Sequence, residues 1–589
     1  MNIFGANISY RALTYLSDRL KNISMFEDAN IDIYQTFGIF DFFENQVEFS
    51  SFKETVSISN SIISEPDRAE YGDFQTNSNL ANEITLFLKN RDVSPEVVIE
   101  PTCGKGNFII ASLVNFNHLQ TVFGIEIYKP YVWECKFNIV DFFLLNPNVS
   151  RPDIYIYHFN VFDFNFDEIK NKYCDKNCLI IGNPPWVTNS QLGSLNSKNL
   201  PKKINFKKHS GIDAITGKGN FDIAEYITEM LIKAFNETIG NIALLVKNSV
   251  IKNIVYEQKR NKHKISNLEK YCIDSKQEFN VSVEASLFFS KLNSKSDFSC
   301  KEFNFYDNSN MIKKFGWVAD KFVSDIENHV NIKNYDGESP FVWRQGIKHD
   351  CTKIMELDKQ NGYFLNKLNE EVELESGLVY GFLKSSDLKN TIAQQTRKFT
   401  IITQTKVGQE TGYIKRDYPK TYDYLLTHKS FFDARKSSIY NNKPLFSIFG
   451  VGDYSFLPYK IAISGLYKTF HFTLVLPQEN KPVMLDDTCY FIGFEKIEFA
   501  VYTLILLNSS ETKKLLESIT FPDAKRTFTK DTLMRVDLFK LSQKIDFKEV
   551  NRCLDELNRT YSLNVSMNFW NNYLKTVKPI EQMQLQLFG

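Results

Sequence analysis

Short apolar runs alternate with helical patterns between about residues 66 and 290, and this alternation constrains the fold more than any other feature. Strands that alternate with helices form βαβ units, which assemble into a doubly wound, mostly parallel sheet. Sheets of this kind bind ligands at the carboxyl ends of their strands. The sequence therefore predicts an α/β fold with a site at that edge, built on the strands VVIE (97–100), VFGIEI (122–127), IYIYHF (154–159), LIIGN (179–183) and IALLVK (242–247).

The length of 589 residues predicts more than one domain, because a single core rarely grows so large. Residues 1–65 combine helical periodicity with a phenylalanine-rich stretch, and they are predicted to form an N-terminal helical extension. Residues 66–330 hold the alternating pattern. Residues 331–589 have less regular alternation, short aromatic runs and late helices, which predict a separate α+β domain.

The charge balance and the cysteine pattern exclude some classes of protein. The chain has 70 basic and 70 acidic residues, so any contact with nucleic acid must come from a local basic surface. Nine cysteines without a CxxC pair and only eight histidines argue against a zinc site, and no metal site is predicted. We find neither a signal peptide nor an apolar run of membrane-spanning length, and we expect a cytoplasmic protein without membrane contact.

The stretch VVIEPTCGKGNF predicts a strand, a tight turn and the start of a helix. Gly104 and Gly106 allow the backbone to approach a ligand, and a helix start offers unpaired N–H groups. Glu100 ends this strand, and Glu126 ends the next one, where an acidic residue can accept hydrogen bonds from ribose hydroxyls. Either feature alone is more often an ordinary turn or a solvated strand end, but together they favour a bound nucleoside.

The third strand ends in HFNVFDFNF (158–166). Asn160 or Asp163 could bind the ring amine of an adenine, and the phenylalanines could flank its face. Ordinary core aromatics with two polar loop residues explain this stretch equally well.

The fourth strand ends in NPPW (183–186), whose simplest interpretation is a strand-ending turn with a packed tryptophan. Together with EYGDFQT (70–76), EPTCGKGNF (100–108), GIEI (124–127) and FNVSVEA (279–285), however, it resembles the N6-adenine DNA methyltransferases of restriction-modification systems. The order of the motifs resembles the gamma class, in which the target-recognition domain comes last. The resemblance implies a Rossmann-like class I methyltransferase fold followed by a DNA-recognition domain.

The resemblance also implies a cofactor, S-adenosylmethionine, and residues that bind it. Thr76 would hold the methionine carboxylate, Glu126 would bind the ribose, and Asn160 would stand where many relatives carry an Asp facing the cofactor adenine. The implied cofactor-binding set is Thr76, Glu100, Thr102, Gly104, Gly106, Glu126 and Asn160.

The chemistry of an adenine amine explains why NPPW suits this activity. The lone pair of the amine is delocalised into the ring, and two hydrogen-bond acceptors favour the pyramidal form that makes it available. The Asn183 side-chain oxygen and the Pro184 carbonyl can be these acceptors, held in place because prolines restrict φ. A base must leave the duplex to reach them, and aromatic faces then replace its stacking. Trp186 would cover one face of the base, and the resemblance implies that Phe279 covers the opposite face. The predicted catalytic set is Asn183, Pro184, Pro185, Trp186 and Phe279.

Contacts with double-stranded DNA are predicted in local basic stretches. Residues 202–209 and 257–264 are two such stretches in the first domain, although charge runs are usually solvated surface. The individual candidates are Lys207, Lys208, Arg344, Lys348, Lys406, Arg435 and Lys436.

Two alternative functions are open at this point. One is a methyltransferase that acts on another amine, in an RNA base or a glutamine side chain. The other is a DNA-recognition subunit of a defence complex without turnover, against which the intact Asn183, Pro184 and Trp186 argue. The large C-terminal domain favours DNA as the substrate. A restriction endonuclease or another defence partner would be encoded separately.

Overall fold

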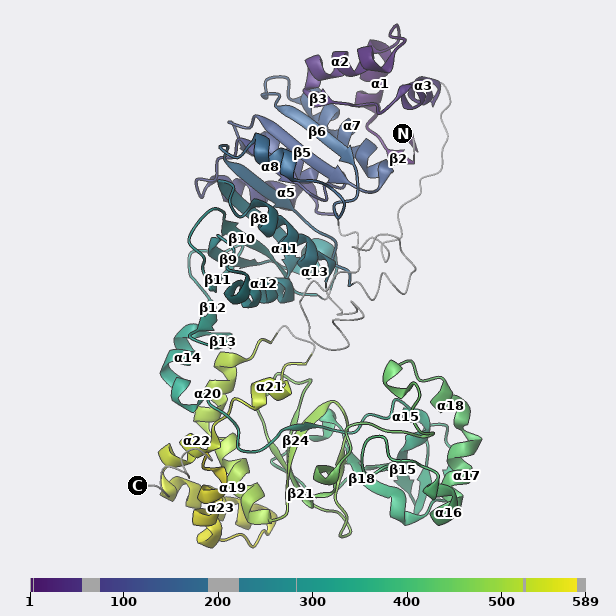
Figure 1. Ribbon diagram of the computed structural model, residues 1–589, viewed down its shortest axis with the longest axis vertical. Coiled ribbons are helices and arrows are strands. Elements are labelled where there is room, and N and C mark those ends of the chain that lie inside the picture. The colour runs from purple at the N-terminus through teal and green to yellow at the C-terminus, as the bar shows by residue number, and fades with distance from the viewer. Residues whose placement is uncertain are drawn as a thin grey trace. The chain divides into compact units, whose positions relative to one another are not determined.

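The computed structural model describes residues 2–3, 5–55, 75–188, 222–281, 283–522 and 526–579. The chain divides into two compact units (Figure 1), here called unit 1 (Met1–Phe322) and unit 2 (Val323–Gly589). The division lies after Phe322, whereas the sequence analysis placed a boundary after residue 330.

Unit 1 is built on an 11-stranded sheet of order β13-β12-β11-β9-β10-β8-β7-β4-β5-β6-β3. The chain enters the middle of the sheet at β4, adds β5 and β6 on one side, and returns to add β7 and β8 on the other, all in parallel. This doubly wound order confirms the predicted fold class. The five predicted strands are β4 (Val97–Glu100), β5 (Thr121–Glu126), β6 (Asp153–His158), β7 (Cys178–Gly182) and β8 (Gly240–Lys247).

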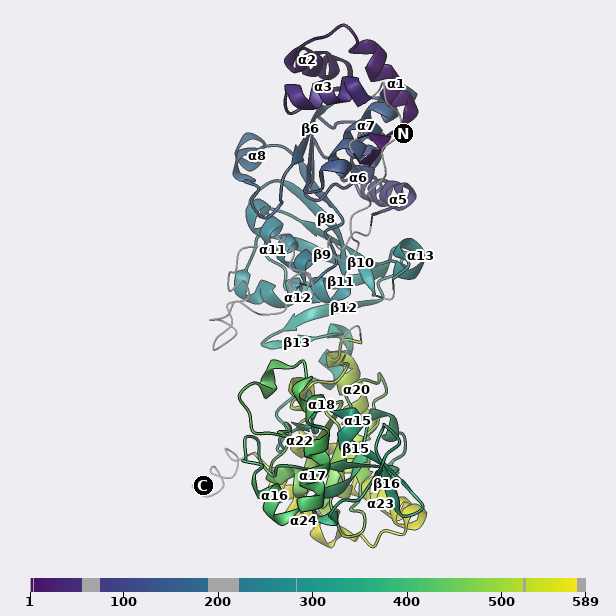
Figure 2. The same ribbon diagram turned by 90° about the vertical axis from the view of Figure 1, so that its right-hand side faces the viewer.

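Helices cover both faces of this sheet (Figure 2). The helices α5, α6 and α7 pack in series along one side, and α8, α11 and α12 along the other. Because both faces are covered, the central strands are continuous apolar runs, and every residue of β4 and β7 is buried. The helices are α5 (Ser78–Lys89), α6 (Asn107–Asn115), α7 (Lys129–Leu145), α8 (Asp167–Lys172), α11 (Ile223–Phe235) and α12 (Asn248–Asn261).

The N-terminal segment joins the sheet instead of only packing on it. A short strand, β3 (Ile39–Phe40), pairs in parallel with β6. Phe42 and Phe43 are buried against Trp133 of α7, and the buried Lys136 donates to the carbonyl oxygen of Phe42 at 2.9 Å. This segment also contains β1 (Asn2–Ile3), β2 (Ala6–Asn7), α1 (Tyr10–Arg19), α2 (Phe26–Phe37) and α3 (Gln46–Thr55).

The other edge of the sheet brings a helix to the carboxyl ends of the parallel strands. Strand β10 (Ala285–Lys291) is antiparallel to β8, so that Ala285, where β10 begins, lies opposite Lys247, where β8 ends. The helix α13 (Ser275–Phe279) precedes β10 and therefore lies near that edge. The remaining strands are β9 (Ser266–Cys272), β11 (Ser299–Asn304), β12 (Lys313–Val318) and β13 (Lys321–Val323).

Unit 2 is an α+β unit with one sheet of order β14-β24-β21-β22-β19 and one of order β17-β16-β15-β20-β18-β23. Their strands are β14 (Arg344–Gln345), β15 (Glu356–Gln360), β16 (Tyr363–Leu365), β17 (Glu371–Val372), β18 (Val379–Leu383), β19 (Ile392–Ala393), β20 (Lys398–Ile401), β21 (Tyr459–Ser464), β22 (Thr473–Val475), β23 (Met484–Leu485) and β24 (Cys489–Phe494). The helices are α14 (Ile326–Ile332), α15 (Thr352–Met355), α16 (Tyr413–Asp417), α17 (Pro419–Thr427), α18 (Lys429–Asp433), α19 (Ile497–Leu507), α20 (Ser510–Ile519), α21 (Lys530–Leu533), α22 (Leu538–Lys544), α23 (Phe547–Tyr561) and α24 (Trp570–Val577).

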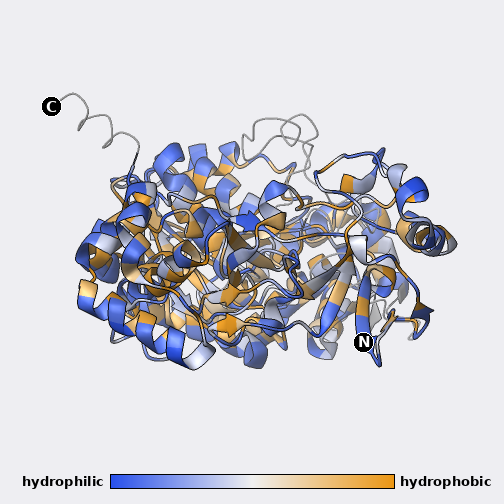
Figure 3. Ribbon diagram, turned by 90° about the horizontal axis from the view of Figure 1, so that it is seen from below, coloured by the Kyte–Doolittle hydropathy of each residue, from blue (hydrophilic) through white to orange (hydrophobic). Residues whose placement is uncertain are grey.

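Hydropathy along the ribbon follows burial. Outer helices carry both hydrophilic and hydrophobic residues (Figure 3), as expected for helices that cover a core. The helix α19 is an exception, since its residues from Ala500 to Leu507 are all buried. None of the helices in the described ranges has the length and apolar character needed to cross a bilayer.

A buried lysine makes the stability of unit 2 depend on pH. Lys460 of β21 is 1% exposed and donates to the Leu457 carbonyl at 2.7 Å, and burial lowers its pKa to about 7. Between that value and the ordinary value near 10.5, the unfolded chain holds a proton that the folded chain lacks, so the free energy of unfolding rises with pH. Lys460→Met should raise this free energy at pH 7 by about 1 kcal/mol or more and remove the rise. Denaturant unfolding between pH 7 and 10 measures both effects. Lys468→Met, at an exposed position, is the control. If Lys460→Met left the pH dependence unchanged, Lys460 would not be its cause.

Candidate active site

A pocket lies where the strands β4, β5, β6 and β7 end. The Gly-containing turn after β4, the end of β5, the loop after β6 and the NPPW segment all contribute to its wall. The sequence-predicted residues that line it are Thr76, Glu100, Thr102, Gly104, Glu126, Asn160, Asn183 and Pro185. The parallel sheet thus brings together residues that are up to about a hundred positions apart in the chain.

Two glycines in the turn after β4 are required by its geometry. Gly104 and Gly106 have φ values of +51° and +83°, which side chains other than glycine rarely adopt. A Cβ on Gly104 would lie 2.4 Å from Gln75 Oε1, and one on Gly106 would lie 2.6 Å from Cys135 Sγ. Gly106 is also the N-cap of α6, so the turn presents backbone N–H groups at the start of this helix.

Glu126 has a structural role that the sequence did not suggest. Its two carboxylate oxygens accept hydrogen bonds from the backbone N–H of Gly104 at 2.9 Å and of Tyr128 at 2.7 Å. Cys103 N–H also donates to the Ile125 carbonyl, at 2.9 Å. The turn after β4 is therefore attached to the end of β5 through this carboxylate.

Glu100 is a buried carboxyl group in the wall of the pocket. It is 3% exposed, and its Oε2 has no hydrogen-bond partner among the described residues. Burial raises the pKa of the Glu100 carboxyl well above its usual range, and the nearby Cys135 and Glu126 add to this rise. A buried acceptor of this kind fits a cationic group of a ligand, which would restore its ionised form.

The loop after β6 forms the third side of the pocket. Phe159, Asn160 and Phe162 line it, and Asn160 Oδ1 accepts from the Phe162 N–H at 3.0 Å. Asp163, the other residue considered for an adenine amine, is exposed and does not line the pocket. Of these two residues, Asn160 is therefore the one that lines the pocket.

Asn183 follows β7, and its side chain is oriented by Thr76. Asn183 Nδ2 donates to Thr76 Oγ1 at 3.2 Å, and the Thr102 hydroxyl donates to the Asn183 backbone oxygen at 3.4 Å. The Thr76 carbonyl in turn accepts from Asn107 Nδ2 at 2.7 Å. The catalytic carboxamide predicted from NPPW is thus linked to the residue predicted to hold the cofactor carboxylate.

Trp186 and Phe279 contact each other. Trp186 is 5% exposed, and its indole Nε1 donates to the Leu245 carbonyl of β8 at 3.3 Å. Its ring meets that of Phe279 edge to face, with 4.9 Å between the centroids and 66° between the planes. The sequence analysis expected these rings on opposite faces of one base. In the described conformation they leave no space between them, so a base could enter only if Phe279 moved.

An ion pair beside NPPW was not predicted. Lys247 Nζ, at the end of β8, lies 2.6 Å from Asp222 Oδ2, and both side chains are mostly buried. Asp222 also caps α11 and pairs with Thr188 in an isolated bridge. The segment after Trp186 is therefore attached to β8. The charged residue that ends the apolar run IALLVK was one signal in the sequence.

Unit 2 places the predicted basic residues in different environments. The exposed Arg344 lies 4.8 Å from the centroid of the Tyr454 ring, and Lys348 pairs with Asp350 at 2.9 Å. Lys436 is exposed, and it lines a hollow together with Arg435. Lys406 is exposed as well.

Arg435 differs from these residues because its guanidinium is used within unit 2. It donates to the carbonyl oxygens of Phe432, His349 and Ser447, and it lies 3.7 Å from the centroid of the Tyr440 ring. These contacts give Arg435 a structural role. The sequence analysis had considered it only as a candidate DNA contact.

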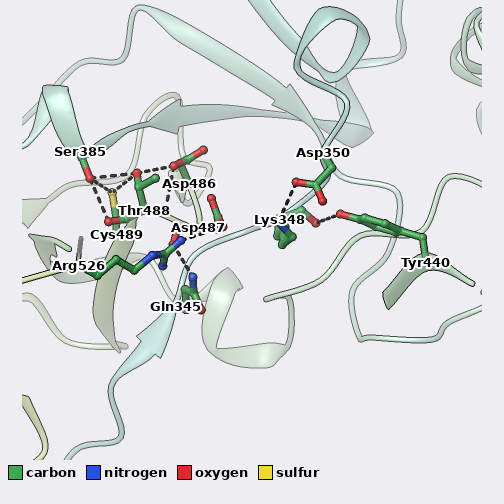
Figure 4. Close-up of polar contacts among 10 residues, drawn as sticks. All are labelled: Gln345, Lys348, Asp350, Ser385, Tyr440, Asp486, Asp487, Thr488, Cys489 and Arg526. Carbon is green, nitrogen blue, oxygen red and sulfur yellow. Dashed lines mark hydrogen bonds and ion pairs between the residues drawn. The ribbon is translucent and has the colours of Figure 1, made fainter. Parts of the chain in front are cut away.

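The strand β14 is attached to the loop between β23 and β24 (Figure 4). Gln345 Nε2 donates to the Asp487 carbonyl at 2.6 Å, and Arg526 donates to the same oxygen at 2.8 Å. The Tyr440 hydroxyl donates to the Lys348 carbonyl at 3.3 Å. The segment that carries Arg344 and Lys348 is therefore held on both sides.

The two basic stretches of unit 1 differ in what the structure describes. Lys207 and Lys208 lie outside the described residues. In the stretch 257–264, Arg260 pairs with Glu257 at 2.7 Å and Lys264 with Glu237 at 2.8 Å. In the part of the chain that the structure describes, no group of three or more His, Cys, Asp or Glu residues is arranged to hold a metal ion.

Comparison with known proteins identifies the family. No family model matches the chain. Over 486 residues, however, it is 40% identical to the type II methyltransferase M.NspV of a Nostoc species, an alignment that covers 82% of this chain and 99% of that protein. The chain belongs to the type II methyltransferases.

One solved structure has a similar fold over most of the chain. The type IIL restriction-modification enzyme MmeI, solved in complex with DNA, matches with a TM-score of 0.54 at 12% identity and covers 92% of this chain and 80% of that one. A DrdV–DNA complex matches with a TM-score of 0.43 at 10% identity, over 86% of this chain and 61% of that one. At 12% identity, the match to MmeI supports the fold of this methyltransferase but not its substrate.

The Glu126 carboxylate accepts two backbone hydrogen bonds, and this predicts the effect of replacing Glu126 by glutamine, which has the same shape. Glu126→Gln replaces one acceptor oxygen by an NH₂ group, so the N–H of Gly104 or Tyr128 loses its partner, at a cost of about 1–3 kcal/mol. Thermal unfolding should show a lower midpoint for unit 1. Glu83→Gln, at an exposed position of α5, is the matched control. An unchanged midpoint would show that the turn does not depend on this carboxylate.

Proposed function

We propose that this type II methyltransferase transfers a methyl group from S-adenosylmethionine to the exocyclic N6 amine of an adenine flipped out of double-stranded DNA, as the modification enzyme of a restriction-modification system. The observation that carries the proposal is the position of Asn183. It directly follows a central strand, shares one pocket with Glu100 and Glu126, and is oriented by Thr76. The carboxamide acceptor and the nucleoside-type pocket are thus parts of one site.

The residues of the pocket fit S-adenosylmethionine. The buried Glu100 suits its ammonium group, the Glu126 carboxylate suits its ribose hydroxyls, and the wall at Asn160 suits its adenine. The Thr76 hydroxyl accepts from Asn183 and retains its own proton to donate to the methionine carboxylate. When bound, the cofactor supplies a methyl group on a sulfonium that is already activated for transfer.

Asn183 and Pro184 would act on the target amine by accepting hydrogen bonds from its two N–H groups. Two acceptors favour the pyramidal amine, whose lone pair points out of the ring plane toward the methyl group. Because Pro184 and Pro185 restrict the backbone, these acceptors need little reorganisation when the base arrives. The protein then contributes mainly positioning and exclusion of water, and it needs no strong general base.

The NPPW aromatic would stack on the flipped base. Base–aromatic stacking contributes about 1–3 kcal/mol per base, which helps to offset the loss of pairing in the duplex. Trp186 is suited to this role because its bond to the Leu245 carbonyl fixes the plane of its ring. Phe279 would move away from Trp186 and cover the opposite face of the base.

Unit 2 would recognise the DNA. Because the whole chain has no net charge, binding relies on local cations, of which Arg344, Lys348 and Lys436 are the proposed contacts in this unit. The Tyr454 ring beneath Arg344 would preorient a guanidinium for a base edge or a phosphate. A restriction endonuclease encoded separately would be the partner that cleaves unmodified sites.

The proposed activity predicts a pattern of modified DNA. Genomic DNA from cells that express the wild-type chain should carry N6-methyladenine at one position of one sequence motif, because unit 2 selects the site before the base is flipped. Long-read sequencing that detects modified bases measures this directly. Unmodified DNA from cells with confirmed expression would refute the proposed function.

The role of Asn183 predicts a separation of binding and turnover. Asn183→Ala removes the acceptor for the target amine, and kcat should fall about 100-fold or more, as it does when one preorganised transition-state contact is lost. Binding of S-adenosylmethionine, measured by calorimetry, should change little. The exposed Asn117→Ala is the control. Retained turnover in Asn183→Ala would contradict the assignment.

A further inference from the structure

A chain of contacts connects the cofactor side of the pocket with the ring proposed to cover the target base. Thr76, whose hydroxyl accepts from Asn183, is followed by Asn77. Asn77 Nδ2 donates to Glu278 Oε2 at 3.0 Å, and Glu278 is followed by Phe279. This hydrogen bond joins the start of α5 to α13, two elements that lie 201 positions apart in the sequence.

The orientation of the Asn77 amide is determined by a second bond. Asn77 is the N-cap of α5, and its Oδ1 accepts from the Leu80 N–H at 2.7 Å. Only the oxygen can accept that bond, so the Nδ2 group is the end that faces Glu278. The other oxygen of Glu278 accepts from the Tyr306 hydroxyl at 3.1 Å. Glu278 is therefore held between donors from α5 and from the segment after β11.

The helix that carries Phe279 is short and depends on such contacts. It spans only Ser275–Phe279, with Asp274 as its N-cap and Asn280 in the left-handed conformation as its C-cap. Ser275 Oγ accepts from the Ala285 N–H at 2.9 Å and attaches its first residue to β10. At its last turn, the contact from Asn77 and the ring of Trp186 position Phe279.

We propose that Asn77 and Glu278 are positioning residues that couple occupancy of the cofactor pocket to the placement of Phe279 at the target base. The inference rests on the proposed function, since it requires a cofactor beside Thr76 and a base beside Trp186. Neither residue touches a reacting atom.

The coupling follows from the two arrangements that Phe279 must have. With no base present, its ring contacts Trp186; with a base between them, α13 must shift, and Glu278 shifts with it. A ligand held by Thr76 would fix the backbone next to Asn77. It would thereby fix the position of Asn77 Nδ2, which donates the hydrogen bond to Glu278. The cofactor thereby acquires different interaction energies with the two arrangements, which is the requirement for coupling two binding sites.

Asn77→Asp is the variant that tests this contact. Aspartate is as good an N-cap as asparagine, so α5 keeps its cap, while the donor toward Glu278 is lost and two carboxylates face each other. Glu278→Ala removes the same contact from the other side. The double variant Asn77→Asp with Glu278→Gln restores a hydrogen bond with reversed polarity, because the glutamine amide can donate to the aspartate.

The measurement is the effect of S-adenosylhomocysteine on capture of the target base. A duplex with the motif found by sequencing, and with 2-aminopurine in place of the target adenine, reports flipping by its fluorescence. In the wild type, saturating S-adenosylhomocysteine should change the affinity for DNA by a factor of about five or more. In Asn77→Asp and Glu278→Ala, the ratio of DNA affinities with and without S-adenosylhomocysteine should fall close to one. The affinity for DNA alone and for S-adenosylhomocysteine alone should each change less than about twofold. The double variant should recover most of the factor.

Controls separate coupling from folding and from the proposed function. The exposed Gln277→Ala, in the same helix, should keep the wild-type factor. A wild-type factor in Asn77→Asp, or a double variant as poor as the single ones, would overturn the inference while wild-type methylation still supported the proposed function. A wild type that methylates no DNA would overturn both.

Discussion

The parallel pairing of β4 with both β5 and β7 is the interaction on which the site depends. Ile99 lies opposite Phe123 on one side and Ile180 on the other, so the three strands end close together. Residues at or just beyond those ends converge for this reason, and Glu126 and Asn183 are two of them. Burial of the strands on both faces stabilises the register, because a slip of one residue would move polar strand ends into the core.

The central strands could be predicted because fully buried parallel strands appear in the sequence as continuous apolar runs. Runs such as LIIG contain nothing polar, and each forms a strand close to its predicted bounds. By contrast, β3 contains only Ile39 and Phe40, too few residues to show any periodicity. The insertion of β10 between β8 and β9 was also beyond prediction, since pairing between strands is decided by the tertiary structure.

For the site, the sequence indicated which residues gather at the sheet edge but not how their side chains are used. From the sequence, Asn160 and Asp163 are equally good candidates for binding an adenine amine. Only the fold shows that Asn160 lines the pocket and that Asp163 is exposed. Arg435 likewise shows a charge in the sequence, whereas its contacts with three carbonyl oxygens belong to a particular loop arrangement. The link from Asn77 to Glu278 joins distant segments, and no local pattern announces it.

The bond from the Trp186 indole to the Leu245 carbonyl has a consequence for how this site can diverge among relatives. Stacking on a base is satisfied by any aromatic ring, and so tolerates exchange among tryptophan, tyrosine and phenylalanine. An in-plane donor at that distance from β8 exists only in the indole. Exchange of Trp186 would therefore need a compensating change around Leu245, so the identity of the ring should vary together with the strand behind it and independently of the DNA motif.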